Sequence, residues 1–115
     1  MRSSGWSHDK VLPKIRQIIY DLCSKKKDWV TKDEIVKALE SDPDISSIAA
    51  EAASSGKFNG NTTKIFSNMV DFMNLWLTEF ESGRVPDPWS GFAKETLEMF
   101  ERRKVNGKWA FKLRK

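Results

Sequence analysis

The pattern of hydrophobic and polar residues predicts a chain made mainly of amphipathic helices. Over about Asp9–Ser24, apolar residues recur at steps of three and four, which places them on one side of a helix. This stripe consists of Val11, Leu12, Ile15, Ile18, Ile19, Leu22 and Cys23. Lys25, Lys26 and Lys27 follow at the C-terminal end, where positive charge complements the helix dipole. We therefore expect a first helix with one buried side.

Capping signals predict two shorter helices. Thr31 and Glu34 have the Thr-x-x-Glu spacing of a capping box, so we expect a helix over Thr31–Glu40. Asp42-Pro43-Asp44 is expected to stop this helix. The alanine-rich segment Ser46–Ser55 then predicts a short helix that ends at Gly56.

The most apolar segment runs from Thr62 to about Ser82 and is predicted to be the central helix of the core. A turn over Lys57–Asn61 precedes it, and Gly83 is expected to end it. Its apolar positions cover more than half of the helix circumference, which leaves only a narrow polar strip. That strip consists of Asn61, Lys64, Asn68 and Asp71, with Ser67 and Asn74 beside it.

The C-terminal segment predicts a β-hairpin with a two-residue turn at Asn106-Gly107, because both residues tolerate a positive φ. Counting outward pairs Val105 with Lys108 and Phe100 with Leu113. One face of the hairpin then carries Phe100, Arg102, Lys104, Trp109, Phe111 and Leu113, with Lys104 placed for a cation–π contact with Trp109. The other face, with Glu101, Arg103, Lys108 and Lys112, is expected to be solvated. Residues Ala93–Phe100 fit either a short helix or the start of a strand.

These elements predict one mainly α domain with a small C-terminal β-hairpin, built from three to five helices over residues 9–115 after a flexible lead-in over residues 1–8. The 115 residues are 39% hydrophobic and include seven Phe and five Trp, which argues against intrinsic disorder. No apolar run exceeds three residues, and no secretory signal precedes the first helix. The single cysteine cannot form an internal disulfide. We expect a protein of the cytoplasm, or of the nucleus in a eukaryotic cell, with no membrane partner.

Charge is concentrated at the two ends of the chain. Residues 1–27 and residues 94–115 each carry a net charge of +5, whereas residues 28–58 carry −4 and residues 59–93 carry −2. Seven basic and no acidic residues lie between Arg102 and Lys115. If folding brings the two ends together, the resulting surface attracts polyanions such as nucleic acid. A solvated surface of an ordinary basic protein is the alternative explanation.

The residues that carry enzymatic chemistry are scarce. His8 is the only histidine and has no partner at metal-binding or catalytic spacing, and Cys23 lies on the apolar stripe of the first helix. No Gly-rich phosphate loop, two-cysteine motif or nucleophile elbow occurs. We therefore expect no catalytic activity, no cofactor and no metal.

The order of elements resembles the winged-helix domain, a variant of the helix-turn-helix. The resemblance rests on the first helix, the very short β-favouring segment Trp29-Val30, the capped helix Thr31–Glu40, the long helix Thr62–Phe80 and the terminal hairpin Phe100–Leu113. Two features depart from the family pattern: the extra helix Ser46–Ser55, and a long helix whose only basic residue is Lys64.

The resemblance implies binding to double-stranded DNA, as a module of a transcription-regulatory or DNA-processing protein. The start of the long helix would contact base edges in the major groove. By position its contact residues would be Asn59, Asn61, Thr62, Thr63, Lys64, Ser67 and Asn68. The hairpin would be the wing, with Arg102, Arg103, Lys104 and Lys108 on phosphates or in the minor groove, extended by Lys112, Arg114 and Lys115.

Three alternatives remain open at this point. Asn59-Gly60-Asn61 makes a good turn and cap without any DNA. The same scaffold also serves as a protein–protein interaction module or homodimer, anchored by Trp6, Trp89 or the loop Arg84–Gly91. A third hypothesis is a binder of single-stranded nucleic acid with Trp109 and Phe111 as stacking platforms.

Overall fold

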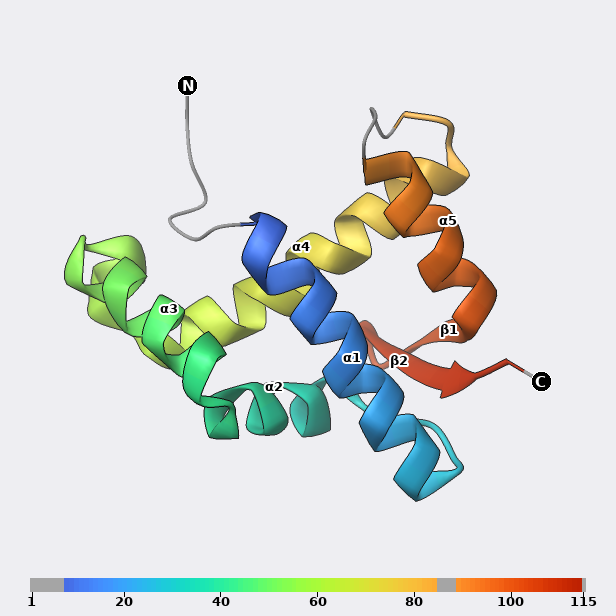
Figure 1. The fold of residues 1–115 in the computed structure, drawn as a ribbon, viewed down its shortest axis with the longest axis horizontal. Coiled ribbons are helices and arrows are strands. Elements are labelled where there is room, and N and C mark those ends of the chain that lie inside the picture. Colours follow the sequence, from blue (N-terminus) through green and yellow to red (C-terminus); the bar gives the residue numbers. More distant parts are fainter. Residues whose placement is uncertain (1–7, 85–88, 115) are drawn as a thin grey trace.

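The structure is a computed structural model that describes residues 8–84 and 89–114. Five α-helices and one antiparallel hairpin make up these residues, in line with the predicted fold class (Figure 1). The elements are α1 (His8–Lys26), α2 (Lys32–Ser41), α3 (Pro43–Ser54), the 3₁₀ turn η1 (Lys57–Gly60), α4 (Thr62–Glu81), α5 (Trp89–Met99), β1 (Phe100–Val105) and β2 (Lys108–Leu113). Apart from His8, which begins α1, the predicted lead-in lies outside the described residues.

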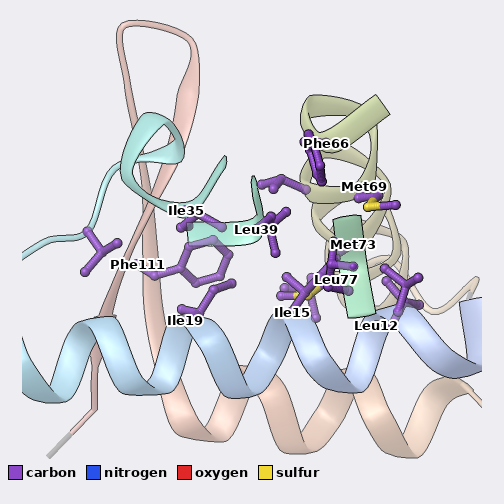
Figure 2. Close-up of a cluster of buried hydrophobic side chains, with 14 of the residues drawn as sticks. Leu12, Ile15, Ile19, Ile35, Leu39, Phe66, Met69, Met73, Leu77 and Phe111 are labelled. Carbon is purple, nitrogen blue, oxygen red and sulfur yellow. The ribbon is translucent and has the colours of Figure 1, made fainter. Parts of the chain in front are cut away.

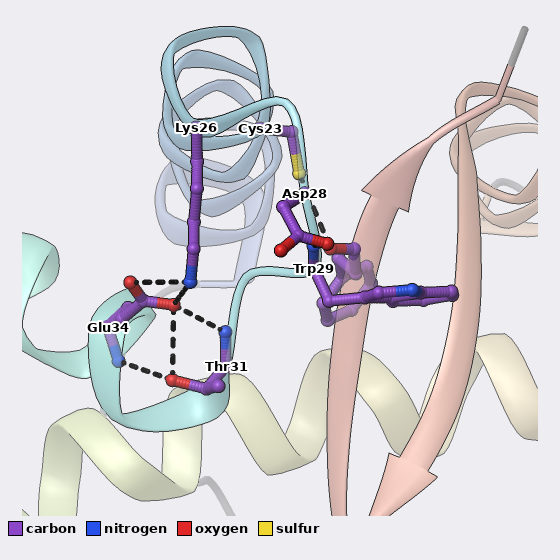
Figure 3. A network of polar contacts seen from close by, with 7 residues as sticks. Cys23, Lys26, Asp28, Trp29, Thr31 and Glu34 are labelled. Carbon is purple, nitrogen blue, oxygen red and sulfur yellow. Dashed lines mark hydrogen bonds and ion pairs between the residues drawn. The ribbon is translucent and has the colours of Figure 1, made fainter.

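The predicted capping box at the start of α2 is confirmed (Figure 3). The Thr31 hydroxyl accepts from the Glu34 N–H at 3.3 Å, and the Glu34 carboxylate accepts from the Thr31 N–H at 2.9 Å. Lys26, in the last turn of α1, donates to the same carboxylate at 2.9 Å. The contact therefore ties the end of α1 to the start of α2.

The third helix begins earlier than Ser46, where the sequence placed its start. Asp42 ends α2, as predicted, but its carboxylate also accepts from the N–H groups of Asp44 and Ile45 and so caps α3. Pro43 occupies the first turn of α3, where its missing N–H costs no hydrogen bond. Asp42-Pro43 therefore both ends α2 and begins α3.

The turn before α4 and the cap of α4 are as expected. Gly56 adopts a left-handed conformation with φ +93°, and the η1 turn follows it directly. The Asn61 side chain accepts from the Lys64 N–H at 3.1 Å and begins α4. The segment before the hairpin, which the sequence left undecided, is helical through Met99, and β1 follows without a loop.

The predicted hairpin register is confirmed at every pair from Phe100↔Leu113 to Val105↔Lys108. Val30 adds a single bridge to the outer edge of β2. Its N–H donates to the Phe111 carbonyl at 2.7 Å, and the Phe111 N–H donates back at 2.9 Å. The β-favouring segment between α1 and α2 therefore acts as a third, one-residue strand.

One core joins the helices to the hairpin (Figure 2). Ile15 and Ile19 of α1, Ile35 and Leu39 of α2, Met73 and Leu77 of α4, and Phe111 of β2 are each at most 1% exposed. In Figure 2 the Phe111 ring lies between Ile19 and Ile35. This burial contradicts the expectation that Phe111 serves as a stacking platform for single-stranded nucleic acid.

Figure 1 shows how the elements are arranged around α4. α1 crosses in front of α4, α2 and α3 lie towards one end of the molecule, and α5 and the hairpin lie towards the other. Within the described part of the chain, no helix combines the length and the apolar character needed to cross a membrane.

Candidate nucleic-acid interface

Arg102, one of the expected phosphate contacts, is held against α4 instead of being presented to solvent. Its side chain is 4% exposed. One guanidinium nitrogen donates to Asn74 Oδ1 at 3.0 Å, and the other lies 3.2 Å from a Glu81 carboxylate oxygen. The guanidinium also lies 4.0 Å from the centre of the Trp109 ring. Burial lowers the pKa of Arg102, and Glu81 acts in the opposite direction. Arg102 therefore docks the hairpin on α4, and we leave it out of the proposed contact surface.

The hairpin face that the sequence placed in solvent is covered in part by Trp29. We call this face, with Glu101, Arg103, Lys108, Ala110 and Lys112, the outer face. Figure 3 shows the Trp29 side chain extending across the strands. Arg103 and Lys112 lie 4.3 and 5.9 Å from the centre of its ring, and Ala110 is 2% exposed. The expectation of a fully solvated face is therefore wrong.

The contact of Trp29 with the hairpin was not predicted, because the two segments are far apart in the chain. The available signal was the β-favouring character of Trp29-Val30, since a strand at Val30 that pairs with the hairpin places Trp29 beside it.

Four cations of the hairpin and its C-terminal extension keep their charge uncompensated. Arg103, Lys104, Lys112 and Arg114 have no carboxylate within 4.0 Å among the described residues. The Lys104 ammonium lies 5.4 Å from the Trp109 ring centre, as the pairing predicted. Lys108 forms a 3.6 Å pair with Asp33, but both side chains are exposed, so this pair contributes little and is easily exchanged.

The residues expected at the start of the long helix are exposed, with two exceptions. Asn59, Asn61, Thr62, Thr63 and Lys64 are exposed, whereas Ser67 and Asn68 are half-buried. Asn59 has a φ of +54° in the η1 turn, and Asn61 uses its side-chain oxygen as the helix cap. Asn59 and Asn61 therefore do form the turn and the helix cap that the first of the open alternatives describes.

Lys64 and Ser67 lie on the same face of α4 as the residues that Arg102 contacts. Positions 64, 67, 71, 74, 78 and 81 follow one another at three- and four-residue steps and so lie on one side of the helix. Arg102 contacts this side at Asn74, Thr78 and Glu81. From Thr62 to Asn74 the helix axis extends about 18 Å at 1.5 Å per residue.

The N-terminus of α2 connects the hairpin tip to α4. Lys108 at the hairpin tip lies 3.6 Å from Asp33, and the neighbouring Lys32 lies 2.8 Å from Asp71 in the middle of α4. These two ion pairs link the hairpin tip through α2 to the middle of α4, and each of them neutralises one carboxylate.

The described residues contain no cluster of three or more His, Cys, Asp or Glu side chains placed to hold a metal ion. Cys23 is 2% exposed with its sulfur 3.7 Å from the Phe111 carbonyl, and burial raises its thiol pKa to about 11.

No protein-family model matches the chain, and neither the comparison with curated proteins nor that with solved structures gave a match. The fold is that of a small α-helical domain with a C-terminal two-stranded hairpin.

Proposed function

We propose that this domain binds double-stranded DNA in the manner of a winged helix, with the hairpin as the wing. The observation that carries the proposal is the set of uncompensated cations Arg103, Lys104, Lys112 and Arg114 on a hairpin that Arg102 docks on α4. Lysine and arginine side chains that lack an internal carboxylate release counterions when they meet phosphates, which is the main source of affinity for DNA.

The fold supports this proposal through the Val30–Phe111 bridge. A one-residue strand between the first two helices pairs with the last strand of the hairpin, which is the arrangement that the winged-helix pattern implies. The additional helix α3, and a long helix α4 whose only basic residue is Lys64, remain departures from that pattern.

We propose that Asn59, Thr62, Thr63 and Lys64 face the major groove while Arg103 and Lys104 contact the neighbouring backbone or minor groove.

A salt titration tests the proposal. We expect binding to a random-sequence 20-base-pair duplex in a mobility-shift assay, with log K falling steeply against log salt concentration. Reversing Arg103 and Lys104 together to Glu should weaken binding to all sequences alike, because phosphate contacts carry no sequence information. Substituting Lys64 with Gln should instead alter the preference among sequences.

The matched control reverses Lys10 and Lys37, which are exposed and form no ion pair within the described part of the chain. It makes the same change in net charge away from the hairpin. Absence of a shift at low salt, or equal losses in the two double variants, would contradict the proposal.

A protein partner is the second candidate function, and the observation that favours it is Leu75. Its side chain is 51% exposed on α4, on the same side of the helix as Asp71. Trp6 and residues 85–88, which were proposed as anchors, lie outside the described residues. Light scattering tests this candidate, because a concentration-dependent dimer that Leu75→Lys abolishes would favour protein binding through α4.

A further inference from the structure

A half-open groove lies between the C-terminal end of α1 and β2, at the base of the hairpin and away from its tip. Its volume is about 380 Å³, and Cys23, Ser24, Lys27, Lys112 and Leu113 line it. Lys27 and Lys112, from segments far apart in the chain, thus both line this groove. Neither lysine has a carboxylate within 4.0 Å among residues 8–84 and 89–114.

The edge of β2 supplies a third donor to this groove. Phe111 directs its N–H and C=O outward, where both bond to Val30. Alternate residues of a strand direct these groups to the same edge, so the Leu113 N–H points the same way. The bridge ends at Val30, and within the described residues this amide has no backbone partner on that edge.

Lys27 holds an unusual backbone conformation at this place. Its φ is +58°, a left-handed conformation that glycine adopts without strain and that other residues adopt at a cost of about 1–2 kcal/mol. It directly follows α1, and its N–H donates to the Cys23 carbonyl at 2.9 Å. Glycine is the residue that this helix end favours, whereas the positive charge of Lys27 complements the dipole of α1 at the same end.

We infer that this groove binds a phosphate group of the DNA backbone, as a second contact point separate from the hairpin tip. The inference rests on the proposed DNA-binding function. Two ammonium groups and one amide N–H form the donor set that a phosphate diester accepts from. Glu101, opposite Lys112 on β1, and Asp28, which accepts from the Trp29 N–H at 2.8 Å, are the nearby carboxylates.

The length of the hairpin sets the separation of the two contact points. Five residue steps from Lys108 to Leu113 span about 17 Å along the strand. This distance corresponds to about five base pairs of duplex. One duplex lying along the hairpin therefore contacts both the tip and the groove, and the groove enlarges the footprint without reading sequence.

The test uses the full chain with the double variant Lys27→Gly and Lys112→Gln. Lys27→Gly alone, which keeps every hairpin cation of the proposed function, must by itself weaken binding for the groove inference to hold. Glycine adopts the left-handed conformation of residue 27 without strain, so the substitution at this position should not destabilise the fold. Thermal unfolding of the variant checks this. We expect roughly tenfold weaker binding to a random-sequence 20-base-pair duplex, the size of effect of one charge-assisted hydrogen bond. The slope of log K against log salt should fall in magnitude by about one to two.

A matched control replaces Lys10 and Lys37 with Gln and should change the affinity by less than about twofold. In the wild-type chain, addition of the duplex should shift the backbone amide signals of Lys27 and Leu113 in a ¹⁵N correlation spectrum. If the wild type binds DNA but the groove variant keeps its affinity and salt slope, the groove inference is wrong and the hairpin proposal stands. If the wild type binds no duplex, both fail.

Discussion

At the scale of single residues, Glu34 links helix capping to the packing of two helices. Its carboxylate accepts from the Lys26 ammonium and from the Thr31 N–H, and these contacts, Lys26 first, lower its pKa below the ordinary value of 4.5. Asp44 beside Lys14 and Glu79 beside Arg84 have pKa values lowered for the same reason. A carboxyl with a lowered pKa stabilises the fold above its unfolded-state pKa, and this contribution is lost as the pH falls through the folded-state pKa.

We predict that Glu34→Gln makes the stability less dependent on pH below about 4.5. The free energy of unfolding of the wild type should decrease as the pH is lowered through this range. The free energy of unfolding of the variant should decrease less, because the variant lacks the Glu34 carboxyl, whose pKa is lowered in the folded state. Urea unfolding at several pH values between 3 and 7, on the order of one pH unit apart, measures the effect. Glu40→Gln, an exposed change on α2 without an ion pair in the described residues, is the control and should keep the wild-type slope.

At the scale of elements, the orientation of the hairpin depends on its docking to α4 through Arg102. The guanidinium meets Asn74, Thr78 and Glu81 along one side of α4 and lies over Trp109 on the hairpin. Asn74 is itself 3% exposed, so its side-chain oxygen depends on Arg102 for a hydrogen bond. The hairpin therefore keeps a defined position relative to the start of α4.

We predict that Arg102→Ala lowers the free energy of unfolding by about 2 kcal/mol. The reason is that the buried Asn74 oxygen loses its donor, in addition to the lost contact with Trp109. Urea unfolding followed by circular dichroism measures the loss. Lys108→Ala removes a cation from the same hairpin but only an exposed ion pair, and should change stability by less than about 0.5 kcal/mol. Equal effects of the two substitutions would rule out a docking role for Arg102.

At the scale of the whole molecule, the helices and the hairpin share one core through Phe111. Its ring is fully buried and packs edge-on to Phe100, with centres 5.8 Å apart, and near Ile19 and Ile35 (Figure 2). Elements that bury their apolar faces against the same side chain are expected to unfold together.

We predict that Phe111→Ala lowers the free energy of unfolding by about 3–5 kcal/mol. In the wild type, the ¹⁵N amide signals of β1 and β2, which report on the hairpin, and far-ultraviolet circular dichroism, which reports on the helices, should give the same urea midpoint. Leu75→Ala removes a 51% exposed side chain and should cost less than about 0.5 kcal/mol. A hairpin signal that is lost at a lower urea concentration than the helical signal would contradict a shared core.

Local patterns predicted the elements with few errors. The Thr31–Glu34 capping box, the Asn61 cap and the Asn106-Gly107 turn depend on residues a few positions apart, so their spacing in the chain specifies them. The hairpin register follows from the turn by counting. The early start of α3 was missed because Asp42 ends one helix and caps the next, and a pattern interpreted as a stop hides the second role.

The class of fold and the excess of positive charge on the hairpin follow from the order of residues alone. Which of those charges remain available depends on packing: Arg102 is buried against α4, Trp29 lies on the outer face, and Lys27 and Lys112 line one groove. The partners in these contacts are between 21 and 85 positions apart in the chain. Helix and turn patterns extend over only a few residues, whereas a side chain's exposure depends on whichever distant segment packs against it.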